Sequence, residues 1–134
     1  MKELAYIDIK IDRDSVHPAD DIYSHEKIIQ FPASGTMAEF LQLVNQPPYL
    51  PAILGGQATW IVDLLGHGES CLGVVAQQWQ QPRLTIPADT PITDLIKSPG
   101  CSFFFRYWCQ ADPERVFLAI QNHIPLPDRY GRDL

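Results

Sequence analysis

Two β-rich segments in the middle of the chain constrain the fold most. Residues 58–65 (ATWIVDLL) and 71–79 (CLGVVAQQW) are rich in apolar and β-branched residues, and the loop GHGES separates them. Two such runs joined by a short glycine-containing loop are typical of a β-hairpin. Because nearly every side chain of the first segment is apolar, we expect that segment to be a central strand of a sheet.

Three further segments are expected to extend this sheet. Residues 4–12 (LAYIDIKID) alternate between apolar and polar side chains, which predicts a half-buried strand. Residues 22–31 predict a second strand that ends at a proline. Residues 101–109 predict another strand, whose alternate positions share one apolar face: Cys101, Phe103, Phe105, Tyr107 and Cys109.

Short helices are expected between and after the strands. Residues 36–39 (TMAE) have the form of a capping box, and the apolar spacing after them predicts a helix over 37–45 that Pro47-Pro48 stops. Thr90, before a proline, is expected to cap a short second helix, and Asp112 to cap a last one.

This order of elements predicts an α+β fold. Hairpin-like units with only short helices favour an antiparallel or mixed sheet, with the helices forming a single pair of layers with it. The chain of 134 residues suits one domain. We place that domain at residues 1–124 and expect 125–134 to be an extended C-terminal tail.

The charge of the chain argues against one class of partner and favours another. Sixteen acidic residues against ten lysines and arginines give a net charge of −6, whereas proteins that grip nucleic-acid backbone need a surplus of bases. Nine of the acids but only four of the bases lie in residues 1–67, and residues 28–82 hold no lysine or arginine. This half of the chain carries either a solvated acidic surface or a negative face that meets a positive partner.

Residue usage also predicts a compartment. The first residues lack the apolar core of a secretory signal, and no apolar run approaches the ~20 residues that span a bilayer. Three cysteines, an odd number, argue against a disulfide framework and fit a reducing environment. We therefore expect a cytoplasmic protein with no membrane and no nucleic-acid partner. The oligomeric state stays open.

Motifs for catalysis are incomplete. Ser70 lies in the sequence GESCL, which lacks the final glycine of a nucleophile elbow and sits between two expected strands. The four histidines have no metal-ligand spacing. We expect no catalytic residue, no metal and no cofactor. A small hydrolase or metal-dependent enzyme that uses His17, His25 and His67 is the alternative.

A second alternative is a ligand-binding or scaffold domain. Its pocket would be lined by four aromatic side chains: Trp60, Trp79, Phe103 and Trp108. These residues are more simply explained as core, because large aromatic side chains contribute most of the area that a core buries.

The remaining interpretation of the acidic first half of the chain is a surface that recognises another protein. Tyr23 lies among Asp20, Asp21 and Glu26, and Glu69 lies in the hairpin loop. An aromatic anchor surrounded by acids suits a basic protein, since aromatic residues supply binding energy and charges supply association rate and register. Packing of Tyr23 on the sheet edge is the competing explanation.

The small acidic α+β character and the segments ATWIVDLL and LGVVAQQW around a variable hairpin resemble an immunity protein of a bacterial contact-dependent growth inhibition or other polymorphic toxin system. The resemblance implies a non-enzymatic inhibitor that binds the C-terminal domain of a cognate toxin, often a basic nuclease. It carries over no site residue. From the charges we hypothesise a toxin-binding face made of Asp12, Asp14, Asp20, Asp21, Tyr23, Glu26 and Glu69.

Overall fold

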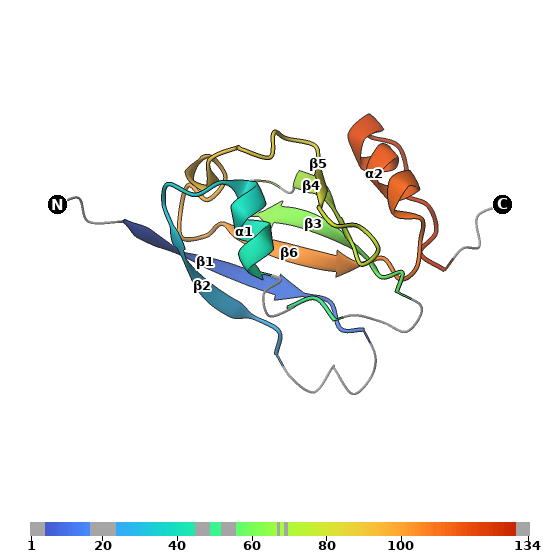
Figure 1. Ribbon diagram of the computed structural model, residues 1–134, viewed down its shortest axis with the longest axis horizontal. Helices are drawn as coiled ribbons and strands as arrows, with labels where there is room; N and C mark the ends of the chain where they lie inside the picture. The colour runs from blue at the N-terminus through green and yellow to red at the C-terminus, as the bar shows by residue number, and fades with distance from the viewer. Residues whose placement is uncertain are drawn as a thin grey trace.

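The computed structural model describes residues 5–16, 24–44, 49–51, 56–66, 68 and 70–130. Six strands form one sheet in the order β2-β1-β6-β3-β4-β5 (Figure 1). The strands are β1 (Tyr6–Arg13), β2 (Lys27–Pro32), β3 (Thr59–Leu65), β4 (Ser70–Ala76), β5 (Arg83–Leu84) and β6 (Ser102–Tyr107). The helical elements are α1 (Met37–Val44), the 3₁₀ turn η2 (Ile92–Asp94) and α2 (Pro113–Asn122). The predicted α+β fold is confirmed.

The sheet is mixed, and β3 lies inside it. β1 pairs with β6 in parallel, whereas the other neighbouring strands are antiparallel. β3 pairs with β6 on one side and with β4 on the other, which confirms the central strand predicted from its apolar side chains. The predicted hairpin joins β3 to β4, with a shift of register between Val62 and Asp63.

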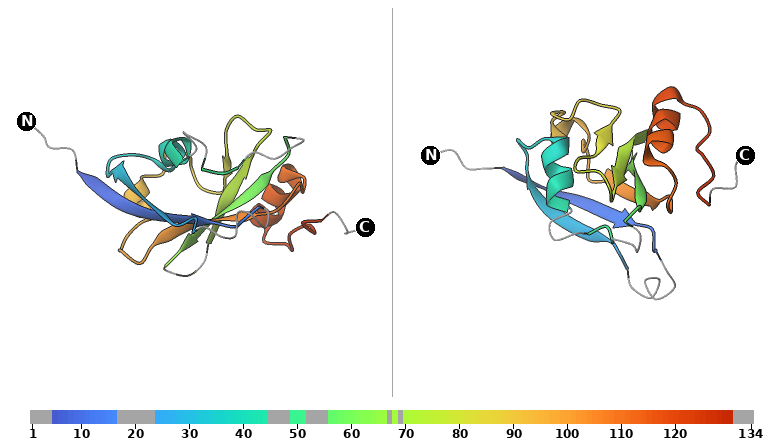
Figure 2. Two further views of the ribbon diagram at one scale, coloured as in Figure 1. Left: turned by 90° about the horizontal axis from the view of Figure 1, so that it is seen from below. Right: turned by 45° about the vertical axis from the view of Figure 1, so that its right-hand side comes forward.

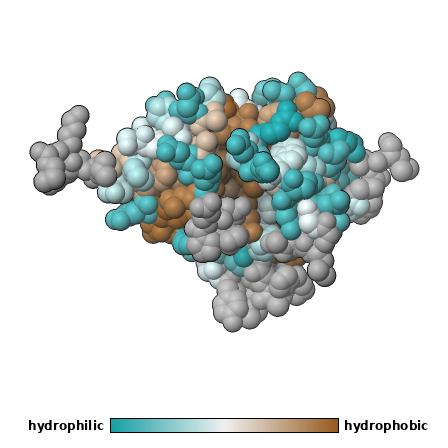
Figure 3. Space-filling model, viewed as in Figure 1, coloured by the Kyte–Doolittle hydropathy of each residue, from teal (hydrophilic) through white to brown (hydrophobic). Residues whose placement is uncertain are grey.

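Helix α1 covers one face of the sheet. The alternate residues Ile9 and Ile11 of β1 are fully buried and belong to the same cluster as Phe40 of α1. The capping box is present, because the Thr36 hydroxyl accepts the Glu39 N–H at 3.2 Å and the Glu39 carboxylate accepts the Thr36 N–H at 3.0 Å. Apolar surface is still visible over β1 and β2 beside α1 (Figure 3).

Helix α2 covers the opposite face, at the β3–β4 end of the sheet (Figure 2). Ile61 and Val74 face away from α1 and form a second cluster with Val116, Phe117 and Ile120 of α2. The expected single pair of layers therefore holds only for the β1–β2 side. β3 is apolar on both faces, so both of its faces need a cover.

Several element boundaries differ from those expected. β2 begins at Lys27, because the polar residues 24–26 precede the strand. β4 ends at Ala76, where a turn begins in which the Trp79 N–H bonds to the Ala76 carbonyl at 3.0 Å. The two-residue strand β5 was not predicted.

The predicted cap at Thr90 is wrong. Its hydroxyl donates to the Pro87 carbonyl at 2.6 Å, and Pro91 precedes η2 without a side-chain cap. The cap at Asp112 is confirmed, since its carboxylate accepts the Glu114 N–H at 3.0 Å.

The segment after α2 lies against the sheet. The Trp108 indole N–H donates to the Pro127 carbonyl at 2.8 Å, and Leu126 packs on the α2 cluster. In the part of the chain that the structure describes, neither helix has the length and apolar character needed to cross a membrane.

Candidate functional site

Strands β1 and β2 have one face that no described helix covers. We call it the β1–β2 face, and its side chains point away from α1: Tyr6, Asp8, Lys10 and Asp12 of β1, with Ile28 and Gln30 of β2. Tyr6 is 53% exposed and Ile28 is 65% exposed. Tyr6 lies opposite Pro32 and Ile28 lies opposite Lys10, so the two exposed side chains lie toward different ends of this face. Large apolar side chains exposed on one sheet face indicate a surface available to a partner.

The charges on this face are mostly negative. Lys10 pairs with Glu26 at 3.2 Å, and both side chains are half exposed. Asp8 is exposed, and Asp12 accepts the backbone N–H of Arg13 at 2.8 Å. The exposed Lys10–Glu26 pair contributes little to stability, because water and salt screen it. Since Glu26 matches Lys10, the two aspartates leave an excess of negative charge next to Tyr6 and Ile28.

The structure brings only part of the hypothesised toxin-binding residues together. Asp12 and Glu26 lie at the β1–β2 face. Asp14 has a structural contact, since its carboxylate accepts the Tyr107 N–H at 2.9 Å and so joins the end of β1 to β6. The other four hypothesised residues lie outside the described residues: Asp20, Asp21, Tyr23 and Glu69.

Sequence reasoning missed Tyr6 and Ile28. The signal for Tyr6 was present in the alternation of residues 4–12, which assigns Tyr6 to the polar face with Asp8 and Asp12. Ile28 carried no such signal. Its exposure depends on the pairing of β2 with β1, where it lies opposite Lys10.

An open pocket of about 1,090 Å³ adjoins this face on the same side of the sheet. We call it the arginine pocket, because three arginines line it from different parts of the chain. Its charged and reactive lining comprises Arg13, Asp14, Asp63, Cys71, Arg106 and Arg129.

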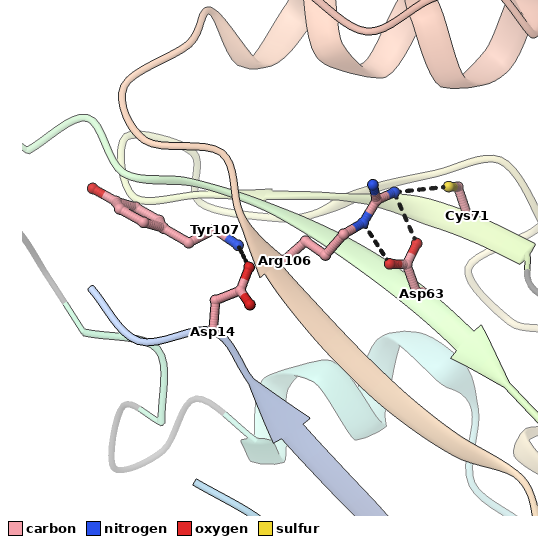
Figure 4. A network of polar contacts seen from close by, with 5 residues as sticks. All are labelled: Asp14, Asp63, Cys71, Arg106 and Tyr107. Atoms are coloured by element: carbon pink, nitrogen blue, oxygen red, sulfur yellow. Dashed lines mark hydrogen bonds and ion pairs between the residues drawn. The ribbon is translucent and has the colours of Figure 1, made fainter. Parts of the chain in front are cut away.

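A charged pair on the central strands forms one wall of the arginine pocket. The Arg106 Nε donates to Asp63 Oδ2 at 2.6 Å, and its Nη2 donates to Asp63 Oδ1 at 3.2 Å and to Cys71 Sγ at 3.2 Å (Figure 4). Asp63 is only 8% exposed, so it requires this partner.

The pair changes the acidity of its neighbours. Burial acts to lower the pKa of Arg106, but the hydrogen bonds and the charge of Asp63 outweigh it and raise that pKa. Burial and the adjacent Asp63 raise the pKa of Cys71 against the lowering effect of Arg106. Cys71 is therefore held as a thiol rather than as a reactive thiolate.

The histidines of the alternative enzyme do not form a site in the described residues. His25 contacts the Ser15 hydroxyl at 3.1 Å, and its carbonyl accepts the Tyr49 hydroxyl. His17 and His67 lie outside the described residues. Within the described ranges, no group of three or more His, Cys, Asp and Glu is placed to hold a metal ion.

The four aromatic residues of the alternative ligand pocket are separated. Trp60 and Phe103 are buried in the cluster under α1, whereas Trp79 and Trp108 pack beside the α2 cluster on the opposite face. They do not line one cavity.

Comparison with known proteins supplies no relative. No family model, no curated protein and no solved structure matches this chain.

Proposed function

We propose that the chain is a non-enzymatic inhibitor, an immunity protein that binds a basic toxin domain through the β1–β2 face. The observation that carries the proposal is that Tyr6 and Ile28, both more than half exposed, lie on one sheet face with Asp8 and Asp12. The net charge of −6 supports a positively charged partner.

The exposed side chains of Tyr6 and Ile28 supply the binding energy in this proposal. Full burial of an isoleucine or a comparable side chain stabilises a complex by about 1.5–3 kcal/mol. Ile28 is 65% exposed in the free chain, so covering it accounts for roughly 1–2 kcal/mol on this scale. The aspartates act mainly on the association rate, which steering between opposite charges lifts toward ~10⁸ M⁻¹s⁻¹ at low salt.

The test uses the toxin domain encoded beside this gene and isothermal titration calorimetry with the purified chain. Ile28→Asp places a charge in the centre of the contact, and we expect it to weaken binding at least about tenfold. Leu118→Asp is the matched control, because Leu118 is 45% exposed on α2, away from the β1–β2 face. Equal affinities for the two variants would refute the assigned face.

The charge contribution is tested separately by stopped-flow association. The double variant Asp8→Asn with Asp12→Asn is expected to slow association and to flatten its dependence on salt. Asp89→Asn with Asp94→Asn is the control, since both of these aspartates are exposed elsewhere on the chain. An absence of any complex with the neighbouring toxin domain would overturn the proposed function itself.

A further inference from the structure

The arginine pocket lies outside the contacts that the proposed toxin interface needs. It is formed where the end of β1, the centres of β3 and β6, the start of β4 and the C-terminal segment meet. Its volume of about 1,090 Å³ is slightly above the range of about 300–1,000 Å³ that is usual for small-molecule sites. In a chain with a net charge of −6, a concentration of arginines at one cavity is unexpected.

The two carboxylates of the pocket are already committed to contacts within the protein. Both oxygens of Asp63 accept hydrogen bonds from Arg106. One oxygen of Asp14 accepts the Tyr107 N–H. Three arginines and two aspartates line the pocket, and Asp63 is matched by Arg106.

Arg106 keeps donors for an additional partner. Its Nε and Nη2 contact Asp63 and Cys71, whereas Nη1 has no hydrogen-bond acceptor among the described residues (Figure 4). The Arg106 side chain is 30% exposed and lines the pocket. Asp63 fixes the orientation of Arg106, and a guanidinium oriented in advance loses less freedom when it binds an anion.

A second guanidinium that lines the pocket contacts the same tryptophan as Arg106. Arg129 lies over the Trp108 ring at 4.3 Å, and Arg106 lies 5.6 Å from the same ring. Both arginines line the pocket, together with the partly exposed Phe104 of β6. Two cations beside flat apolar surface match an oxyanion attached to a planar or apolar group.

We infer that the arginine pocket binds a small organic anion, whose carboxylate or phosphate group contacts Arg106 and Arg129 and whose apolar part lies on Phe104. This site does not depend on the toxin interface, because none of these three residues belongs to the β1–β2 face. The pocket is open, so we expect affinity in the millimolar to high micromolar range, on the order of −4 to −6 kcal/mol.

Isothermal titration calorimetry with phenyl phosphate, benzoate and neutral benzyl alcohol tests the inference. Binding of phenyl phosphate alone assigns a phosphate ligand, binding of benzoate alone assigns a carboxylate, and binding of both leaves the shared oxyanion as the recognised group. Arg129→Gln is expected to weaken anion binding about tenfold, as the loss of one charge-assisted hydrogen bond does. Lys97→Gln is the control, because Lys97 is exposed and does not line the pocket.

Arg106→Gln is a second variant, and circular dichroism checks that it is folded. Arg129→Gln keeps the inference testable if that variant is unfolded, since Arg129 makes no ion pair with a described residue.

Alkylation of the exposed Cys71 is an independent measure of ligand binding, because Cys71 lines the pocket and its modification can be followed by mass spectrometry. A bound anion should slow iodoacetamide modification of Cys71 and leave Cys109, which does not line the pocket, unchanged. Any one of three results would overturn the inference. These are no binding of either anion, an affinity for benzyl alcohol equal to that for the anions, and an unchanged anion affinity in Arg129→Gln.

Discussion

The Asp63–Arg106 pair allows a quantitative prediction about stability, because its two members differ in burial. The Asp63 side chain is 11% exposed, whereas that of Arg106 is 30% exposed. Removing one partner of a buried pair costs about 3–5 kcal/mol when the remaining charge has no access to water, and far less when water reaches it. The cost should therefore depend on which partner is removed.

The variant Arg106→Gln leaves the nearly buried Asp63 carboxylate without its cation. We expect it to lower the free energy of unfolding by about 2–4 kcal/mol, below the full buried value because Arg106 is partly exposed. Asp63→Asn retains an acceptor oxygen and leaves the more exposed partner behind, so its cost should be about 1–2 kcal/mol. The double variant should lose less than the sum of the two, with a coupling energy of about 1–3 kcal/mol.

Urea denaturation, followed by tryptophan fluorescence, gives the free energy of unfolding of the unchanged chain, the two single variants and the double variant. An unchanged dependence of that free energy on urea concentration indicates that unfolding stays two-state. Equal costs for the two single variants would refute the argument from unequal burial. A cost below about 0.5 kcal/mol for Arg106→Gln would show that the pair behaves as an exposed one.

Three further predictions concern single positions. Burial and nearby carboxylates raise the pKa of Tyr49 to about 12, so absorbance titration should find one tyrosine that ionises late. Because the unfolded chain ionises this tyrosine first, the free energy of unfolding should fall as pH rises from 10 toward 12. Tyr49→Phe should lack both the late ionisation and this fall. Gly66→Ala should cost about 2 kcal/mol or more by thermal denaturation, because φ is +118° and the new Cβ would lie 2.5 Å from the Gly100 carbonyl oxygen; Gly68→Ala, with open space around it, should cost only about 1 kcal/mol. Thr36→Ala should lower the unfolding free energy by about 1 kcal/mol through loss of the α1 cap, whereas a change within 0.2 kcal/mol would contradict that role.

Elements whose signal is local were predictable from the sequence. The capping box before α1 and the Asp112 cap of α2 depend on residues two or three positions apart, and both are present. The central position of β3 followed from its apolar side chains. The end of β4 was predicted at Trp79, whereas a turn already begins after Ala76, where Gln77 and Gln78 interrupt the apolar residues.

The arginine pocket had no local signal. Asp63 and Arg106 are 43 residues apart, and they face one another only because β3 pairs with β6 in a register that sets Ile61 opposite Arg106. A shift of that register by one residue would turn Arg106 and Asp63 toward opposite faces of the sheet. The order of the strands could not be deduced from the sequence, and therefore the pocket that they form could not be predicted.

The same dependence on register explains why charge counting located the acidic half of the chain but not the exposed β1–β2 face. Of the hypothesised acids, Asp14 contributes its carboxylate to strand pairing with Tyr107 and Glu26 is matched by Lys10. Side-chain charge therefore measures available charge only where no neighbouring strand or side chain uses it. On the β1–β2 face, the exposed Asp8 meets that condition, whereas Asp12 accepts the Arg13 N–H. For this reason the exposed side chains of Tyr6 and Ile28, rather than the acid count, decide where the proposed partner binds.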